Sequence, residues 1–367
     1  MLCFGSRCEQ IDAPGAAVPP RARLRSESTK APPAPNRRVM SHHDNGEPIA
    51  HRTAPDRLVI ATRESPLALW QAEHVQSRLR QVYRQTRVDL AKMTTRGDQI
   101  LETPLYQAGG KGLFIKELEV ALLEGRADLA VHSLKDVPME LEEGFALVAI
   151  GEREDPRDAF VSNRHACLDE LPRGARVGTA SLRRACQLRA RRPDLQVETL
   201  RGNVGTRLRK LDAGEFDGIL LAAAGLIRLG LADRIRETIE PSLSLPAVGQ
   251  GALGFEARAD RKDVAGLLRV LDHEPTRQRV TAERAMSRAL GGSCNVPLGA
   301  HAVLDGERLR LTGFVAMPDG SRMIRGESEG LATEAEAIGL DLAEQLRGRG
   351  AGEVMALLAD HLSRPAN

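Results

Sequence analysis

Basic and hydroxyl residues cluster at three points where a predicted strand is followed by a predicted helix. The first cluster contains Arg63 and Ser65, the second Thr179, Ser181, Arg183 and Arg184, and the third Arg201, Asn203 and Arg207. A helix N-terminus offers free backbone N–H groups and the positive end of the helix dipole, so each junction favours an anion. Together the junctions predict a ligand with several negative groups. For any one junction the alternative is an ordinary helix cap and a solvated or ion-paired arginine.

The segment HSLKDVP places Lys135 and Asp136 at the end of a predicted strand, on the same side of the sheet as these junctions. Nearby positive charge favours the ionised form of a carboxyl group, so Asp136 should remain a carboxylate. It would then stabilise a developing cation rather than donate a proton. The alternative is an exposed Lys–Asp pair of little energetic consequence.

The glycine-rich segment AGGKGLF is not a nucleotide-binding phosphate loop. Gly112 follows Lys111 where that motif requires Ser or Thr. We expect instead a glycine-rich mobile cover, with Lys111 and Phe114 facing the ligand.

Cys294 directly follows the predicted C-terminus of a helix, in LGGSCNVPLG. That position does not acidify a thiol, so no rapid turnover nucleophile is indicated. A thiol alkylated once and then kept fits the setting, and inert packing is the alternative. The five cysteines are scattered, which favours a reducing compartment over a disulfide framework. The nine histidines lack metal-ligand spacing, so no metal is expected.

The elements that must position these residues follow an alternating pattern from Leu58 onward. The run 58–63 reads as a buried strand, and Ser65 and Pro66 then supply a cap and a first-turn proline for a helix. The apolar stripe of that helix consists of Ala68, Ala72, Val75, Leu79 and Val82. Further strand–helix units follow, which predicts α/β architecture with parallel-type sheets covered on both faces.

The pattern changes in the last quarter of the chain. A helix through 276–290 stops at Gly291 and Gly292, short β-like runs with DG and PDG turns follow, and a last helix covers about 334–346. We therefore expect two α/β domains and a smaller C-terminal α+β domain.

The composition of the chain argues against several classes of function. The 367 residues include 52 basic and 50 acidic ones, a net charge of +2 that announces no polyanionic partner. Aromatic residues make up only 3%, which removes the stacking platforms of single-stranded nucleic-acid binders. The sequence contains no apolar run of about 18 residues, the length needed to cross a membrane. The first 57 residues hold 8 of the 20 prolines and show no periodicity, so they are expected to form a disordered extension.

In this order, the motifs resemble those of the porphobilinogen deaminase (hydroxymethylbilane synthase) family. The resemblance runs from about Leu58 to the C-terminus and is carried by IATRESPLALWQA, TTRGD, GGKGLF, AVHSLKDVP, EREDPRDAF, GTASLRR, RGNVGTRL, LPAVGQGALG and GGSCNVPLG. It implies a cytoplasmic transferase of tetrapyrrole (porphyrin, heme) biosynthesis, working as a monomer. Such an enzyme joins four porphobilinogen molecules head to tail, releases four ammonia and yields hydroxymethylbilane. No nucleic acid, membrane or metal is implied as a partner.

The resemblance also assigns roles to residues of this chain. Cys294 would hold a dipyrromethane cofactor through a thioether, and Asp136 would be the central catalytic group. The acetate and propionate arms would be bound by Arg63, Ser65, Lys135, Thr179, Ser181, Arg183, Arg184, Arg201, Arg207 and Arg228. The implied fold has two periplasmic-binding-protein-like α/β domains around a cleft, formed by 58–152 with 248–270 and by 153–247, and a C-terminal domain, 271–367, that carries Cys294.

Two other hypotheses remain at this stage. One is a two-domain solute-binding module, which needs neither Asp136 nor Cys294. The other is a nucleic-acid or phosphosugar binder that exploits the arginines. A cofactor covalently attached to Cys294 would favour the enzyme over both of these binding proteins.

Overall fold

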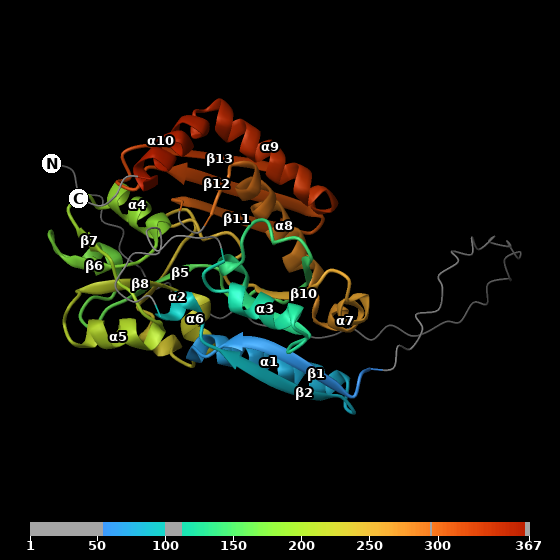
Figure 1. Ribbon diagram of the computed structural model, residues 1–367. Helices are drawn as coiled ribbons and strands as arrows, with labels where there is room; N and C mark the ends of the chain where they lie inside the picture. Colours follow the sequence, from blue (N-terminus) through green and yellow to red (C-terminus); the bar gives the residue numbers. More distant parts are fainter. Residues whose placement is uncertain (1–53, 100–111, 294–295, 364–367) are drawn as a thin grey trace, which may run out of the picture. The chain divides into compact units, whose positions relative to one another are not determined.

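The computed structural model describes residues 54–99, 112–293 and 296–363. Most of the expected extension 1–57 lies outside the described residues, and so do Lys111 and Cys294. The described chain forms three sheets with their covering helices (Figure 1). None of the helices in these ranges is both long and apolar enough to cross a membrane.

The first sheet has five strands in the order β2-β1-β3-β10-β4. Its strands are β1 (Arg57–Arg63), β2 (Arg87–Met93), β3 (Leu129–Ser133), β4 (Phe145–Ile150) and β10 (Leu253–Arg258). The helices in these stretches of chain are α1 (Pro66–Val82), α2 (Arg96–Gln99), α3 (Lys116–Leu123) and α7 (Lys262–Leu268). Its core includes Leu58 and Ile60 of β1, Val88 of β2 and Phe255 of β10.

Helix α1 shows how the local sequence sets an element of this fold. Its cap, Ser65, accepts a hydrogen bond from the Ala68 amide at 3.4 Å, and Pro66 opens the helix. Four residues of the predicted stripe are buried: Ala68, Ala72, Val75 and Leu79. The fifth, Val82, is 48% exposed because it is the last residue of the helix.

The second sheet has five strands in the order β7-β6-β8-β5-β9. Its strands are β5 (Asp158–Val161), β6 (Arg176–Gly178), β7 (Gln196–Glu198), β8 (Gly218–Ala222) and β9 (Glu237–Ile239). The helices are α4 (Leu182–Arg191), α5 (Val204–Asp212) and α6 (Ala223–Arg228). Short 3₁₀ helices connect elements throughout the fold: η1 (Leu134–Asp136), η2 (Leu168–Glu170), η3 (Ala232–Arg234), η4 (Arg269–Leu271) and η5 (Ala332–Glu334).

The prediction of parallel-type sheets is wrong for one strand of each sheet. Strand β5 pairs antiparallel with β8 and β9, and β10 pairs antiparallel with β3 and β4. Each is the first strand that the chain enters after it crosses from one sheet to the other. No helical crossover within the same sheet precedes these strands, so the rule that makes successive βαβ strands parallel does not apply to them.

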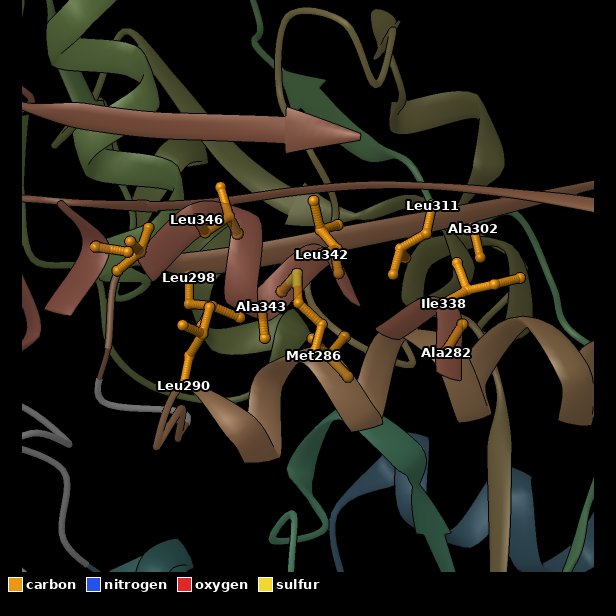
Figure 2. Close-up of a cluster of buried hydrophobic side chains, with 14 of the residues drawn as sticks. Ala282, Met286, Leu290, Leu298, Ala302, Leu311, Ile338, Leu342, Ala343 and Leu346 are labelled. Carbon is orange, nitrogen blue, oxygen red and sulfur yellow. The ribbon is translucent and has the colours of Figure 1, made fainter. Parts of the chain in front are cut away.

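The C-terminal part is an antiparallel sheet, β11-β12-β13, with helices against it, as the α+β prediction requires. Its elements are α8 (Glu274–Ala289), β11 (Leu298–Asp305), β12 (Arg308–Ala316), β13 (Met323–Leu331), α9 (Ala335–Gly348) and α10 (Ala351–Ser363). Figure 2 shows Met286 of α8 and Leu342 of α9 meeting Leu311 in its core. The α8 and α9 helices were predicted, whereas α10 was not.

Candidate functional site

A cavity of about 580 Å³ lies where the carboxyl ends of strands from both five-stranded sheets meet. Its walls come from the turns after β1, β3 and β8, from α4, and from the loop before α5. Ligands of open α/β sheets bind at this end of the strands. Its charged lining side chains are Arg63, Glu64, Asp98, Lys135, Asp136, Arg184, Arg201, Arg207 and Arg228. Cations therefore outnumber carboxylates two to one in the lining.

Most of the predicted site residues are brought together here. The cavity is lined by Arg63, Ser65, Phe114, Lys135, Asp136, Arg184, Arg201, Arg207 and Arg228. It is not lined by Thr179, Ser181 or Arg183. Lys111 and Cys294 cannot be placed, since both lie outside the described residues.

The turn after β1 contributes a cation that already has an internal partner. The guanidinium of Arg63 forms an ion pair with Asp98 and lies 4.3 Å from the centre of the Phe114 ring. Burial opposes ionisation of Asp98, but hydrogen bonds from Arg63 and Thr95 hold its pKa below the ordinary value. Phe114 and Asp98 thus fix the direction of Arg63 before any ligand arrives.

The turn after β3 carries the carboxylate predicted to be catalytic. Asp136 ends η1, which is anchored by the fully buried Leu134, and no ion pair to Asp136 exists in the described chain. Beside it, burial above all, and then the charge of Arg184, lowers the pKa of Lys135 to about 8, against the opposing effect of Asp136. Lys135 is therefore mainly protonated at neutral pH and loses its charge as the pH rises through about 8.

The N-terminus of α4 is built around a buried carboxylate, Asp158 of β5. Arg183 binds it through Nη1 at 2.7 Å and Nη2 at 2.9 Å, and the Nε of Arg184 donates to it at 2.8 Å. Ser244 also donates to Asp158, at 2.8 Å. Despite burial, these partners hold the pKa of Asp158 far below its ordinary value. Arg183 also donates to the Leu245 carbonyl at 2.6 Å, so both of its terminal nitrogens bind groups inside the protein.

The hydroxyls at this junction also have local partners. Ser181 caps α4 by accepting a hydrogen bond from the Arg184 amide at 3.4 Å, and Thr179 accepts one from the Ser181 amide at 3.2 Å. The alternative interpretation of Ser181 as a helix cap is therefore confirmed.

The opposite wall carries cations whose hydrogen bonds within the described chain go to backbone carbonyls. Arg207 of α5 donates to Gly202 at 2.8 Å, and Arg228 at the end of α6 donates to Gly251 at 2.6 Å. Neither has a carboxylate within ion-pair distance among the described residues. Burial is the main cause that lowers the pKa of each to about 10. Asp136 and Glu154 oppose this effect on Arg207 and Arg228 respectively, but from beyond ion-pair distance. Desolvated guanidinium groups that form no ion pair favour binding of an anion.

Several polar residues of the lining or its support were missed, and three of them contact other polar residues there. Asp98 pairs with Arg63, Gln71 donates to Ser133 at 2.8 Å, and Gln250 accepts from Arg184 at 3.2 Å. Asp98 and Gln250 stand in the motifs TTRGD and LPAVGQGALG, which was the available signal. Nothing local in those motifs says which cation each residue meets.

A second cavity of about 420 Å³ lies along α1 and shares Arg228 with the first. It is lined by the stacked rings of Trp70 and His74, and its three arginines, Arg228 among them, are equal in number to its acids, Glu152, Glu154 and Asp272. The excess of positive charge therefore belongs to the first cavity.

Metal chemistry has no ligand set in the described ranges. No group of three or more His, Cys, Asp or Glu side chains there could hold a metal ion.

The chain is similar to known proteins over most of its length. Residues 58–266 match the family described as "Porphobilinogen deaminase, dipyromethane cofactor binding domain", and residues 277–348 match "Porphobilinogen deaminase, C-terminal domain". A curated porphobilinogen deaminase of Chromobacterium violaceum is 60% identical over 301 residues, 82% of this chain and 97% of that protein.

Solved structures also show distant similarity. The methionine binding protein MetQ is 15% identical, with a TM-score of 0.40, over 59% of this chain and 89% of its own. The periplasmic VFT2 domain of Bordetella pertussis BvgS is 14% identical, with a TM-score of 0.37, over 59% of this chain and 86% of that domain.

Proposed function

The chain belongs to the porphobilinogen deaminase family, and on that premise we propose that it is a hydroxymethylbilane synthase. It joins four porphobilinogen molecules head to tail on a covalent dipyrromethane primer. Four ammonia molecules leave, and linear hydroxymethylbilane is released for tetrapyrrole biosynthesis. The observation that carries this proposal is that two guanidinium groups of the lining, those of Arg207 and Arg228, form no ion pair within the described chain.

The cavity residues fit a carboxylate-rich group. Each pyrrole ring brings two carboxylates, and the lining offers six cations, of which Arg63 is internally paired with Asp98 and Arg184 with Asp158. Guanidinium groups bind carboxylates in a bidentate way that fixes position as well as charge. Arg207 and Arg228 gain the counterions they lack when such a ligand enters. The dipyrromethane, held through a thioether to Cys294, would supply further carboxylates for these cations and a free pyrrole α-carbon as the nucleophile.

We propose that the carboxylate of Asp136 stabilises the positive charge that develops on the substrate. When the amino group of the aminomethyl arm of porphobilinogen leaves as ammonia, its carbon stays on the ring, and the positive charge that develops is shared by the pyrrole nitrogen. A carboxylate in a water-poor cavity stabilises that charge strongly, because it is fixed before the reaction begins. Asp136 lines the cavity and has no ion pair in the described chain, so its charge is available to the substrate.

The cations do the positioning. Arginines on the walls bind the acetate and propionate arms and hold the ring so that its reacting carbon faces the growing chain, which removes orientational entropy from the reaction. Lys135 adds a positive charge beside Asp136 below its pKa of about 8. After carbon–carbon bond formation the α-proton leaves and aromaticity is restored. Water ends the sequence by releasing the tetrapyrrole.

The same proposal covers the organisation of the chain. We assign one α/β domain to 58–152 with 248–270, a second to 153–247, and a cofactor-bearing domain to 271–367, after an extension of 57 residues. The two crossings of the chain between the five-stranded sheets support this division. A cytoplasmic monomer is proposed, supported by the near-neutral charge and the scattered cysteines.

Intact-mass measurement of the purified protein tests the central claim. The wild type should carry the added mass of a dipyrromethane, and Cys294→Ala should have the mass of the bare chain and no activity. Cys186→Ala is the matched control, because that buried cysteine lies in α4 and should leave the adduct in place. An active wild-type protein of unmodified mass would overturn the claim that a covalent primer is attached. Binding of a small anion without turnover would favour the solute-binding module instead.

A further inference from the structure

Gln250 joins the two walls of the cavity. It is 1% exposed and lies in the segment that returns from the second sheet to the first. Its Oε1 accepts from Lys135 Nζ at 3.5 Å and from Arg184 Nη2 at 3.2 Å. Lys135 follows β3 of the first sheet, whereas Arg184 belongs to α4 beside the second. One amide oxygen therefore contacts a cation from each side.

The orientation of this amide is fixed by its other end. Its Nε2 donates to the Pro156 carbonyl at 2.6 Å and to Asp158 Oδ1 at 2.9 Å. A carboxylate only accepts hydrogen bonds, and the lysine and arginine groups only donate them. A reversed amide would leave both ends mismatched, so the oxygen must face the cations.

We propose that Gln250 is a positioning residue, which sets the spacing of Lys135 and Arg184 so that both grip substrate carboxylates. A neutral acceptor holds both groups without adding a negative charge, so Lys135 keeps its charge for a ligand, whereas Arg184 also pairs with Asp158. The inference rests on the proposed function for the identity of those carboxylates. The contacts of Gln250 themselves do not depend on it.

The surroundings of Lys135 make this role measurable. The charged groups that face it are Asp136 on its own turn, Arg183 and Arg184 from α4, and Asp158 from β5. A carboxylate in place of the Gln250 amide raises the pKa of Lys135, whereas removal of the acceptor lowers it. Two substitutions of Gln250 should therefore shift the pKa of Lys135 in opposite directions.

Steady-state kinetics of the holoenzyme with porphobilinogen give the first test. Gln250→Glu should raise KM because the new carboxylate competes for the cations. Gln250→Met should raise KM because the cations are no longer held. We expect an increase of about tenfold in each, the effect of one charge-assisted hydrogen bond, with a smaller change in kcat. The pH above which KM rises should lie near 8 in the wild type, higher in Gln250→Glu and lower in Gln250→Met.

Gln187→Met is the matched control. Gln187 is also buried, at 7% exposure, but its amide binds the backbone of Arg183 and Leu245 and no cationic group. Its replacement should lower the melting temperature and change neither KM nor the pH above which KM rises. Equal effects of Gln187→Met and the Gln250 variants on KM would overturn the positioning role, because loosening of the fold would explain both.

A second readout needs no turnover. Competitive labelling with acetic anhydride at several pH values, read by mass spectrometry of the Lys135 peptide, reports the protonation of this amine. The half-reaction pH should increase in the order Gln250→Met, wild type, Gln250→Glu. The same value in all three overturns the inference. If Gln250→Met fails to fold, the Glu variant decides alone, because an upward shift supports the inference and no shift overturns it.

These readouts also separate the inference from the proposed function. A wild type that does not turn over porphobilinogen overturns the proposed function, while the labelling order still tests Gln250. An active wild type with unshifted variants overturns only the role of Gln250.

Discussion

At the N-terminus of α4, Arg183 and Arg184 surround the carboxylate of Asp158, whereas across the cavity Arg207 and Arg228 donate to backbone carbonyls. Both regions bring guanidinium groups out of water. In the first, an internal carboxylate compensates the loss of hydration, so the cluster can stabilise the protein without a ligand. In the second, no described carboxylate lies within ion-pair distance, and an anionic ligand would supply that compensation.

The carboxylates show the same contrast. Asp158 accepts from Arg183, Arg184, Ser244 and Gln250, whereas Asp136 has no ion pair in the described chain. Residue type therefore does not decide whether a charge serves the fold or the chemistry. The difference lies in which partners the fold brings to it.

Removing the charge of Asp136 should have the largest effect. In Asp136→Asn, kcat should fall by about 10³-fold, since a fixed charge opposite a developing cation is lost. The melting temperature should stay near that of the wild type, because no internal partner is left unpaired. Single-turnover kinetics together with thermal unfolding check both parts. Near-normal turnover would remove Asp136 from the mechanism.

Asp158→Asn should instead act on stability. Two buried guanidinium groups lose their counterion, so the free energy of unfolding should fall by about 3 kcal/mol. The pKa of Asp158 is depressed in the folded state, so its contribution is present above the unfolded value of about 4 and is lost as the pH falls through the folded value. Urea unfolding should therefore show a difference between wild type and variant at pH 7 that shrinks on acidification below about pH 4. A difference that is constant with pH would contradict this assignment.

Arg207→Met should have the smallest effect of the three. KM for porphobilinogen should rise by about ten- to a hundredfold, the loss of a hydrogen bond to a charged group, with stability unchanged or higher. Arg183→Met is the matched control and should lower the melting temperature instead. The comparison of the two regions would fail if both substitutions destabilised the protein to the same extent.

Much of the site could be inferred from local sequence. Ser65 and Ser181 stand before helices and do cap them, and the stripe from Ala68 to Leu79 is buried as predicted. The clusters of basic residues predicted a ligand with several negative groups, and Arg207 of the third cluster lines a cavity rich in cations, whereas Arg228 was indicated only by the family resemblance. The cap and stripe predictions succeeded because caps and stripes depend on residues a few positions apart.

Other features could not be inferred this way. Arg183 and Arg184 are neighbours in one motif, yet only Arg184 lines the cavity. Nothing in the order of residues distinguishes them, because their partner Asp158 is 25 and 26 positions away. Likewise, the antiparallel course of β5 and β10 depends on where the chain crosses between sheets.

The sequence by itself determined the α/β class, the helix starts and the kinds of charge at the strand ends, because short-range geometry and side-chain chemistry specify them. The tertiary structure alone decided which of those charges are neutralised within the protein. Burial and ion pairing arise between segments distant in the chain, as when Gln250 reaches Lys135 across 115 positions and Arg184 across 66. A desolvated charge that forms no ion pair within the protein then favours binding of a ligand of opposite charge.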